Sequence, residues 1–231
     1  MQLSKRMQAV ADLITPGEAL ADVGTDHGYI PIYAVEENIV KRAIAMDINK
    51  GPIERAASHI AEHGLEAYIE MRCCDGVKGL CAGEVQTVVI AGMGGGLMQK
   101  IMEDGAEVLQ TVSEIILQPQ SEIDKFRQYL VSHGWMIERE DMVFEDGKYY
   151  PMMRVKRGKM EVSNELFWKF GIYLLEDRNP VLKDFLDRSL DNCSHILEKL
   201  YSSGRSEEDE RVIELKEEMR QLEAARKYYE M

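Results

Sequence analysis

The first 133 residues alternate short apolar runs with segments of helical periodicity, and this alternation restricts the possible folds most. The apolar runs predict five strands, at residues 18–23, 42–48, 67–73, 86–91 and 113–118. Helices are predicted between and after them, at residues 29–38, 50–63, 96–109 and 123–133. Short continuous apolar runs are typical of strands that helices cover on both faces, and strand–helix repeats with short connections form parallel sheets. The sequence therefore predicts an α/β fold.

The pattern changes after Gly134. Two further strand-like segments, residues 135–144 and 149–156, flank a tight-turn signal at Asp146-Gly147. Asp-Gly tolerates the positive φ angles of such a turn, so the two segments predict a β-hairpin. A parallel sheet that ends in a hairpin is a specific arrangement within the α/β class.

From about residue 163 the whole chain has a helical pattern. Apolar stripes at residues 182–200 and 212–226 are separated by a Ser-Ser-Gly break. Two such stripes joined by a short turn predict an antiparallel helical hairpin, a small coiled coil. We therefore expect two domains, a ligand-binding domain at residues 1–160 and a helical hairpin domain at residues 161–231.

Composition restricts the partners and the compartment. The 231 residues carry a formal net charge of −13, so an RNA substrate would need a local positive patch on an acidic protein. No run of about 18 apolar residues occurs, which predicts that no segment spans a membrane. The four cysteines include no Cys-x-x-Cys pair, and we expect reduced thiols in a cytoplasmic protein without a metal site.

The loop of residues 22–28, Asp-Val-Gly-Thr-Asp-His-Gly, follows the first predicted strand. Its glycines let the backbone turn sharply and approach a ligand, while the next helix offers free N–H groups. Asp26 would repel the pyrophosphate of a dinucleotide but would pair with the cationic methionine end of S-adenosylmethionine. The alternative is a tight turn capped by Thr25 and Asp26, without a ligand. The predicted cofactor contacts here are Asp22, Gly24, Thr25, Asp26 and Gly28.

Acidic residues follow the next two predicted strands. Asp47, followed by Ile48, can accept hydrogen bonds from both ribose hydroxyls of an adenosine ligand. Asp75, followed by Gly76, can accept a hydrogen bond from the adenine amino group, which favours a methyltransferase over a dehydrogenase. A helix cap and an ordinary Asp-Gly turn are the alternatives that need no ligand.

A glycine-rich segment ends the fourth predicted strand. We expect Ala91-Gly92-Met93 to contact the cofactor and Gly94-Gly95 to contact the substrate. Glycines allow close approach, and ligands of open α/β sheets bind at the carboxyl ends of the strands. The Asp/Asn-Pro-Pro-Phe/Tyr motif used on exocyclic amino groups is absent.

Gln118-Pro119-Gln120 ends the fifth predicted strand. The two amides can donate and accept hydrogen bonds, which suits the edge of a planar base, and Pro119 stiffens the loop. Tyr149 and Tyr150 of the hairpin are expected either to stack on a base or to fill the sheet edge. We predict substrate contacts at Pro119, Gln120 and both tyrosines.

The remaining candidates are catalytic and basic side chains. Asp26, His27 and Gln118 are the predicted catalytic residues, with His27 as a candidate general base or else a structural histidine. The densest positive charge predicts phosphate contacts, with a solvated surface as the alternative. These basic residues are Lys5, Arg6, Arg154, Lys156, Arg157 and Lys159.

Taken together, these motifs resemble the bacterial tRNA (adenine-22-N1)-methyltransferase family, known as TrmK. The resemblance covers essentially the whole chain. The segments that carry it are Leu3-Ser-Lys-Arg6, Asp22-Val-Gly-Thr-Asp-His-Gly28, Ile90-Ala-Gly-Met-Gly-Gly95, Leu117-Gln-Pro119, Glu145-Asp-Gly-Lys-Tyr-Tyr150 and the terminal helical hairpin. The chain departs from the family at Gln120, where Asn is general, and in its acidity.

The resemblance implies a Rossmann-like class I methyltransferase sheet, with five parallel strands followed by the hairpin. It also implies S-adenosyl-L-methionine as cofactor, and methyl transfer to N1 of an adenine in tRNA by a monomer or weak homodimer. The C-terminal hairpin would then help to hold the RNA. Two other functions stay open: a methyltransferase acting on a protein or small molecule, and a non-catalytic nucleotide-binding protein with a dimerisation arm.

Overall fold

The structure is a computed structural model, and it describes residues 1–230. The chain divides into two compact units, Met1–Glu161 and a second that begins at Val162. The first unit contains a seven-stranded sheet with helices, whereas the second is entirely helical. Whether the two units act as separate domains stays a prediction.

The sheet of the first unit has the strand order β3-β2-β1-β4-β5-β7-β6. The strands are β1 (Gly17–Val23), β2 (Val40–Asp47), β3 (Ile69–Cys73), β4 (Thr87–Met93), β5 (Glu114–Pro119), β6 (Trp135–Glu145) and β7 (Lys148–Arg157). The first five pair in parallel, and β7 pairs antiparallel with both β5 and β6. The predicted parallel sheet with a final hairpin is therefore present.

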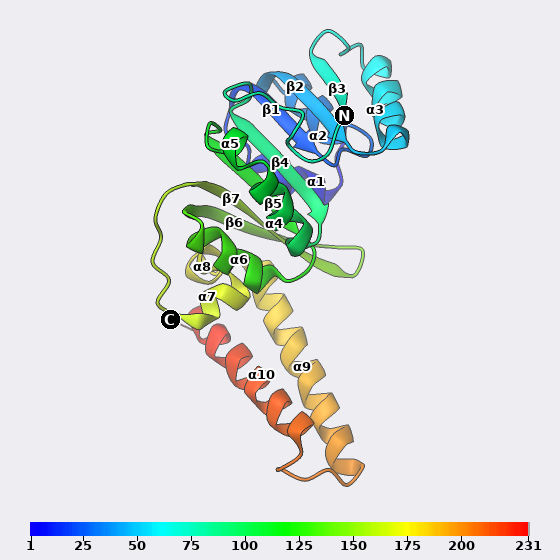
Figure 1. Ribbon diagram of the computed structural model, residues 1–231. Coiled ribbons are helices and arrows are strands. Elements are labelled where there is room, and N and C mark those ends of the chain that lie inside the picture. The colour runs from blue at the N-terminus through cyan, green and yellow to red at the C-terminus, as the bar shows by residue number, and fades with distance from the viewer. Residues whose placement is uncertain (231) are drawn as a thin grey trace. The chain divides into compact units, whose positions relative to one another are not determined.

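Helices cover both faces of this sheet (Figure 1). They are α1 (Lys5–Asp12), α2 (Tyr29–Glu36), α3 (Lys50–Glu62), α4 (Gly95–Asp104), α5 (Ala106–Leu109) and α6 (Ile123–Ser132). Residues of α1, α2 and α3 share one apolar core with Val89 and Ile116, while α4, α5 and α6 lie in front of the sheet in Figure 1. The neighbouring Val88 and Ile115 are also fully buried, so both strand faces are covered.

The structure differs from the expected elements at two places. The helix predicted at residues 96–109 is interrupted at Gly105, where a Cβ atom would lie 1.9 Å from Cγ2 of Val77. Only glycine permits this close approach. The N-terminal segment, for which no helix range was given, forms α1, which is capped by the Ser4 hydroxyl and contacts α2, β5 and β6.

The second unit is built on two long helices. Its elements are α7 (Glu165–Phe170), α8 (Ile172–Glu176), α9 (Pro180–Ser202), α10 (Glu210–Arg226) and the short 3-10 helix η1 (Lys227–Tyr229). Helices α9 and α10 lie side by side (Figure 1) and bury Leu186 and Leu215, among others. The helical hairpin is therefore present, whereas its supercoiling stays a prediction. None of the helices within residues 1–230 is long and apolar enough to cross a membrane.

Candidate active site

A cleft of about 330 Å³ opens where β1 and β4 end. The loop after β1, the end of β4, the loop after β5 and helix α1 all contribute to its wall. The predicted site residues that line it are Arg6, Asp22, Gly24, Thr25, Asp26, His27, Ala91, Gly92 and Gln120. The strand order places β1, β4 and β5 side by side and thus brings together residues that follow strands far apart in the sequence, as expected for a ligand site in an open α/β sheet.

Two glycines shape the loop after β1. Gly24 has a φ of 80°, and a Cβ atom there would lie 2.1 Å from Cε of Met93. Gly28 has a φ of 71° and begins α2 as its N-cap residue. Both conformations are in the left-handed region that side chains rarely adopt, so the sharp turn depends on glycine at these positions.

Asp22 supplies a buried carboxylate at this cleft. Asp22 is only 7% exposed. Burial together with the negative charge of Asp47 raises the pKa of Asp22 to about 6. No basic side chain within residues 1–230 forms an ion pair with it. A cationic ligand group bound beside Asp22 would favour the charged carboxylate and lower this pKa.

Asp26, the residue expected to pair with the ligand's cation, already has a partner. Its carboxylate forms an ion pair with Arg55 of α3, which holds the pKa of Asp26 below its usual range. Asp22 rather than Asp26 is thus the carboxylate that faces the cleft without a cation. The reason is tertiary, because Arg55 approaches from a helix 29 positions further along the chain.

His27 lies in a small aromatic cluster. Its ring is nearly parallel to those of Tyr29 and His59, with centroids 5.1 Å away in each case. Its Nε2 atom lies 3.4 Å from Oδ2 of Asp26, and its Nδ1 atom is buried without a hydrogen-bond partner among the described residues. The predicted role of His27 as a general base stays a prediction.

Asp47 and Asp75 lie outside this cleft. Oδ1 of Asp47 accepts a hydrogen bond from the Asn49 amide at 2.7 Å. Asp75 and Gly76 line a separate hollow of about 40 Å³, and the Asp75 carboxylate pairs with Lys78 at 3.0 Å. One large apolar side chain is exposed near each aspartate. Ile48, which follows Asp47 in the sequence, is 62% exposed, and Leu97, which lines the hollow with Asp75, is 51% exposed.

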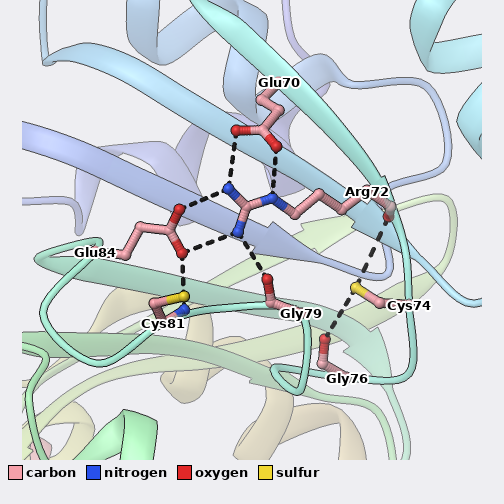
Figure 2. Close-up of polar contacts among 7 residues, drawn as sticks. All are labelled: Glu70, Arg72, Cys74, Gly76, Gly79, Cys81 and Glu84. Carbon is pink, nitrogen blue, oxygen red and sulfur yellow. Dashed lines mark hydrogen bonds and ion pairs between the residues drawn. The ribbon is translucent and has the colours of Figure 1, made fainter.

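The loop that carries Asp75 is held by Arg72, the last but one residue of β3. Figure 2 shows its guanidinium between the carboxylates of Glu70 and Glu84, with N–O distances of 2.6–2.9 Å. The same guanidinium donates to the Gly79 carbonyl at 2.7 Å. Hydrogen bonds from Arg72 lower the pKa of Glu84 to about 2. This cluster ties the middle and the last residue of the loop of residues 74–84 to β3, the edge strand of the sheet.

Gln118, predicted to be catalytic, is completely buried. Its Oε1 atom accepts hydrogen bonds from Nη1 of Arg6 at 3.1 Å and from the Gly92 amide at 3.2 Å, and its Nε2 atom donates to the Pro119 carbonyl. The guanidinium of Arg6 also lies over the ring of Tyr150, 5.4 Å from its centroid. In this structure Gln118 therefore holds Arg6 at the cleft wall and does not itself line the cleft.

The basic cluster at the end of β7 is largely neutralised. Arg154 and Lys156 both form ion pairs with Glu138 of β6, at 2.8 and 2.9 Å. Arg157 lies over the Trp135 ring, 3.9 Å from its centroid, and donates to the His133 carbonyl. Phosphate contacts at Arg154 and Arg157 stay a prediction, and both side chains already have partners that proximity in the sequence does not reveal.

Other predicted substrate positions do not line the cleft. Tyr149 packs on the Phe144 ring, with centroids 4.6 Å apart, and so fills the hairpin. Gly94 is the N-cap of α4, and a Cβ at Gly95 would lie 2.7 Å from the Ser121 carbonyl oxygen. Gly95 is therefore required for helix packing.

Within residues 1–230, no three His, Cys, Asp or Glu side chains are grouped to hold a metal ion.

Comparison with known proteins identifies the family. A family model described as a methyltransferase domain matches residues 3–153. The tRNA (adenine(22)-N(1))-methyltransferase of Bacillus subtilis is 31% identical over 92% of each chain. The chain belongs to the tRNA (adenine(22)-N(1))-methyltransferase family.

Two solved structures extend this result to the fold. The B. subtilis M1A22 tRNA methyltransferase TrmK superposes with a TM-score of 0.82 at 30% identity, covering 97% of this chain and 99% of that chain. TrmK of M. capricolum, in complex with S-adenosyl-homocysteine, gives 0.83 at 26% identity over 99% of both chains. The predicted Rossmann-like methyltransferase fold is thereby confirmed.

For this member of the family, sequence reasoning missed part of the cleft wall. Met7, Tyr29 and Ile30 line the cleft but were not among the expected site residues. Tyr29 follows the glycine loop directly and begins α2, so its place at the cleft was open to inference. Met7 reaches the site only because α1 packs beside α2 and β5, and no local signal indicates this.

Proposed function

We propose that this chain uses S-adenosyl-L-methionine to methylate N1 of an adenine in tRNA, at position 22 as in the name of its B. subtilis relative. One observation carries the proposal: the full-length likeness to this relative coincides with a cleft at the carboxyl ends of β1 and β4. We further propose that it works in the cytoplasm, as a monomer or weak homodimer.

The cleft and its surroundings fit the cofactor. The buried carboxylate of Asp22 would bind the ammonium group of the methionine end. Gly24 and Gly92 present bare backbone, since both have φ angles of 80° and no side chain. Asp47 would accept hydrogen bonds from the ribose hydroxyls, and Asp75 from the adenine amino group, after releasing Lys78. When bound, the cofactor supplies a methyl group on a positively charged sulfur.

The chain's own contribution to the reaction is alignment. N1 of adenine is neutral and has a free lone pair, so it can attack the methyl group without a general base. The N1–CH3 bond forms as the S–CH3 bond breaks, and the positive charge passes to the adenine ring. Holding the reacting atoms in line can contribute about 7–11 kcal/mol to lowering the barrier. Gln120 and the backbone at Gly92 line the cleft where the base would enter.

The tRNA must expose N1, because base pairing hides this atom. Unstacking the nucleotide costs a few kcal/mol, which contacts elsewhere on the RNA must offset. We propose that residues 161–231, the helical hairpin domain, provide part of these contacts, while residues 1–160 bind the cofactor. Every proposed cofactor contact lies before residue 94, which supports this division.

Labelled S-adenosyl-L-methionine and undermodified total tRNA test the function. We expect the label in tRNA, and in 1-methyladenosine after digestion to nucleosides. The net charge of −13 favours a second candidate, a protein or small-molecule acceptor. Label that enters a cell extract only outside its RNA would support that candidate and refute the tRNA proposal.

A further inference from the structure

Arg6 is a cation at the cleft whose charge is not balanced. It lines the cleft from α1 and is partly buried, yet no carboxylate in the described part of the chain forms an ion pair with it. Several other arginines of the same unit differ in this respect. Arg55 pairs with Asp26, Arg72 with Glu70 and Glu84, and Arg154 with Glu138. A partly desolvated guanidinium without a counter-ion is a binding site for an anion.

The guanidinium is held in place before any ligand arrives. Oε1 of the buried Gln118 accepts from its Nη1 atom at 3.1 Å, and the Tyr150 ring lies beneath it. Its Nε and Nη2 atoms form no hydrogen bond within residues 1–230, so these donors stay available. At Gly92 a Cβ atom would lie 3.5 Å from Nη1 of Arg6, and the glycine keeps this side of the cleft open.

The positions of Gln118 and Tyr150, which hold Arg6, indicate which ligand Arg6 binds. Gln118 lies on β5 and Tyr150 on β7, whereas the proposed cofactor contacts lie at the ends of β1, β2 and β4 or in the loops after β1, β2 and β3. In the sheet, β4 separates β1 from β5 and β7. Adjacent strands lie about 4.8 Å apart, so Arg6 is held on the side of the cleft away from the first three strands.

We propose that Arg6 binds a backbone phosphate of the tRNA beside the target adenosine, and that Gln118 is its positioning residue. This inference rests on the proposed function. A phosphate fits better than the base, because methylation leaves positive charge on the adenine ring and a guanidinium against that ring would oppose the reaction. Arginine also matches phosphate geometry through two parallel hydrogen bonds.

Two substitutions of Arg6 separate its charge from its shape. Arg6→Gln removes the charge, and Arg6→Lys keeps it. Arg6→Gln should weaken tRNA binding roughly ten- to a hundredfold and lower the slope of log affinity against log salt by about one. Arg6→Lys should keep the slope of the parent. S-adenosyl-L-methionine affinity, measured by calorimetry, should stay unchanged in both.

Lys41→Gln is the matched control. Lys41 is 75% exposed and pairs with Glu18 at the amino-terminal ends of the strands, opposite the cleft. Lys41→Gln removes one positive charge, as Arg6→Gln does, and we expect its tRNA affinity and salt slope to match those of the parent.

Gln118→Met tests the positioning role. This variant removes the oxygen that holds Arg6 but leaves the charge, so tRNA binding should weaken while the salt slope stays unchanged. A simple loss of packing at Gln118 would leave tRNA affinity intact once the variant is folded. The Arg6 variants carry the test alone if this buried substitution prevents folding.

Three results would overturn the proposal or its premise. Loss of cofactor affinity in Arg6→Gln, in proportion to its effect on tRNA, would mean that Arg6 binds the cofactor carboxylate instead. Unchanged tRNA affinity and salt slope in Arg6→Gln would exclude any phosphate contact. A wild-type protein that transfers no methyl group to tRNA would refute the proposed function, and the phosphate assignment with it.

Discussion

Asp22 is the side chain through which pH should act on this protein. Its pKa of about 6 lies above the usual 3.8, mainly because burial disfavours the charged form. In the free protein, the folded state therefore favours protonated Asp22. This contribution to stability is present below pH 3.8 and is lost as the pH rises through about 6. Binding of a cation requires the opposite protonation state.

Cofactor affinity should consequently fall in acid. Between pH 7 and pH 5 most of Asp22 becomes protonated, so S-adenosyl-L-methionine should bind roughly tenfold more weakly at pH 5. Calorimetry across this range measures the effect. Asp22→Asn should bind weakly with little pH dependence, whereas Asp124→Asn, an exposed acidic residue of α6, should behave as the parent. A parent-like pH profile in Asp22→Asn would exclude Asp22 as the group responsible.

Asp47 should hold the ribose. One of its carboxylate oxygens caps the Asn49 amide, and the other forms no hydrogen bond within residues 1–230. Loss of a charge-assisted hydrogen bond costs about 1.5–3 kcal/mol, so Asp47→Ala should weaken cofactor binding roughly ten- to a hundredfold. Unchanged affinity in a folded Asp47→Ala protein would contradict this assignment, and circular dichroism establishes the folding.

At the scale of elements, one buried ion pair joins α6 to β6. Arg127 of α6 and Glu140 of β6 have side chains only 2% and 0% exposed, and both Nε and Nη2 of Arg127 lie 2.8 Å from Oε1 of Glu140. Burying two charges costs desolvation energy that their attraction must offset. The pair therefore matters more for the pairing of these two elements than for net stability.

This balance can be measured by urea unfolding. Glu140→Leu removes the carboxylate of this pair and leaves the Arg127 charge buried, so it should lower the free energy of unfolding by about 3–5 kcal/mol. The double variant Arg127→Met with Glu140→Leu should lose much less, since no charge stays buried. A double variant whose loss equals the sum of the losses in Glu140→Leu and Arg127→Met, each measured alone, would show that the residues act independently.

At the scale of the whole molecule, we propose that function is divided between the two units. The cleft lies entirely within the first unit, Met1–Glu161, whose core is built from its own strands and helices. The helical unit has its own buried residues, including Leu186 and Leu215. Each unit thus has the buried apolar residues that an independent domain needs.

Removal of residues 162–231 should separate cofactor binding from RNA recognition. We expect the truncated protein to bind S-adenosyl-L-methionine with nearly the parent affinity, while tRNA methylation falls sharply. Circular dichroism and calorimetry establish that it is folded and loaded, and the labelled-tRNA assay measures the loss. Full methylation by the folded fragment would mean that the helical hairpin does not hold the RNA.

The sequence by itself determined the order of the elements and the turns between them. Strand positions follow from apolar runs, and the turn at residues 22–28 follows from glycines whose φ angles no other residue adopts easily. The predicted strands differ from β1–β7 by at most a few residues at their ends. These features depend on neighbours along the chain, which is why a single sequence contains them.

Only the tertiary structure decided which charges stay free to bind a ligand. Asp26 is paired by Arg55, and Arg154 by Glu138, while Arg6 reaches Gln118 across 112 positions of the chain. Helix α3 supplies Arg55, the pairing of β6 with β7 supplies Glu138, and the packing of α1 against β5 brings Arg6 to Gln118. Ion pairs depend on distance in space, and separation along the chain does not set that distance.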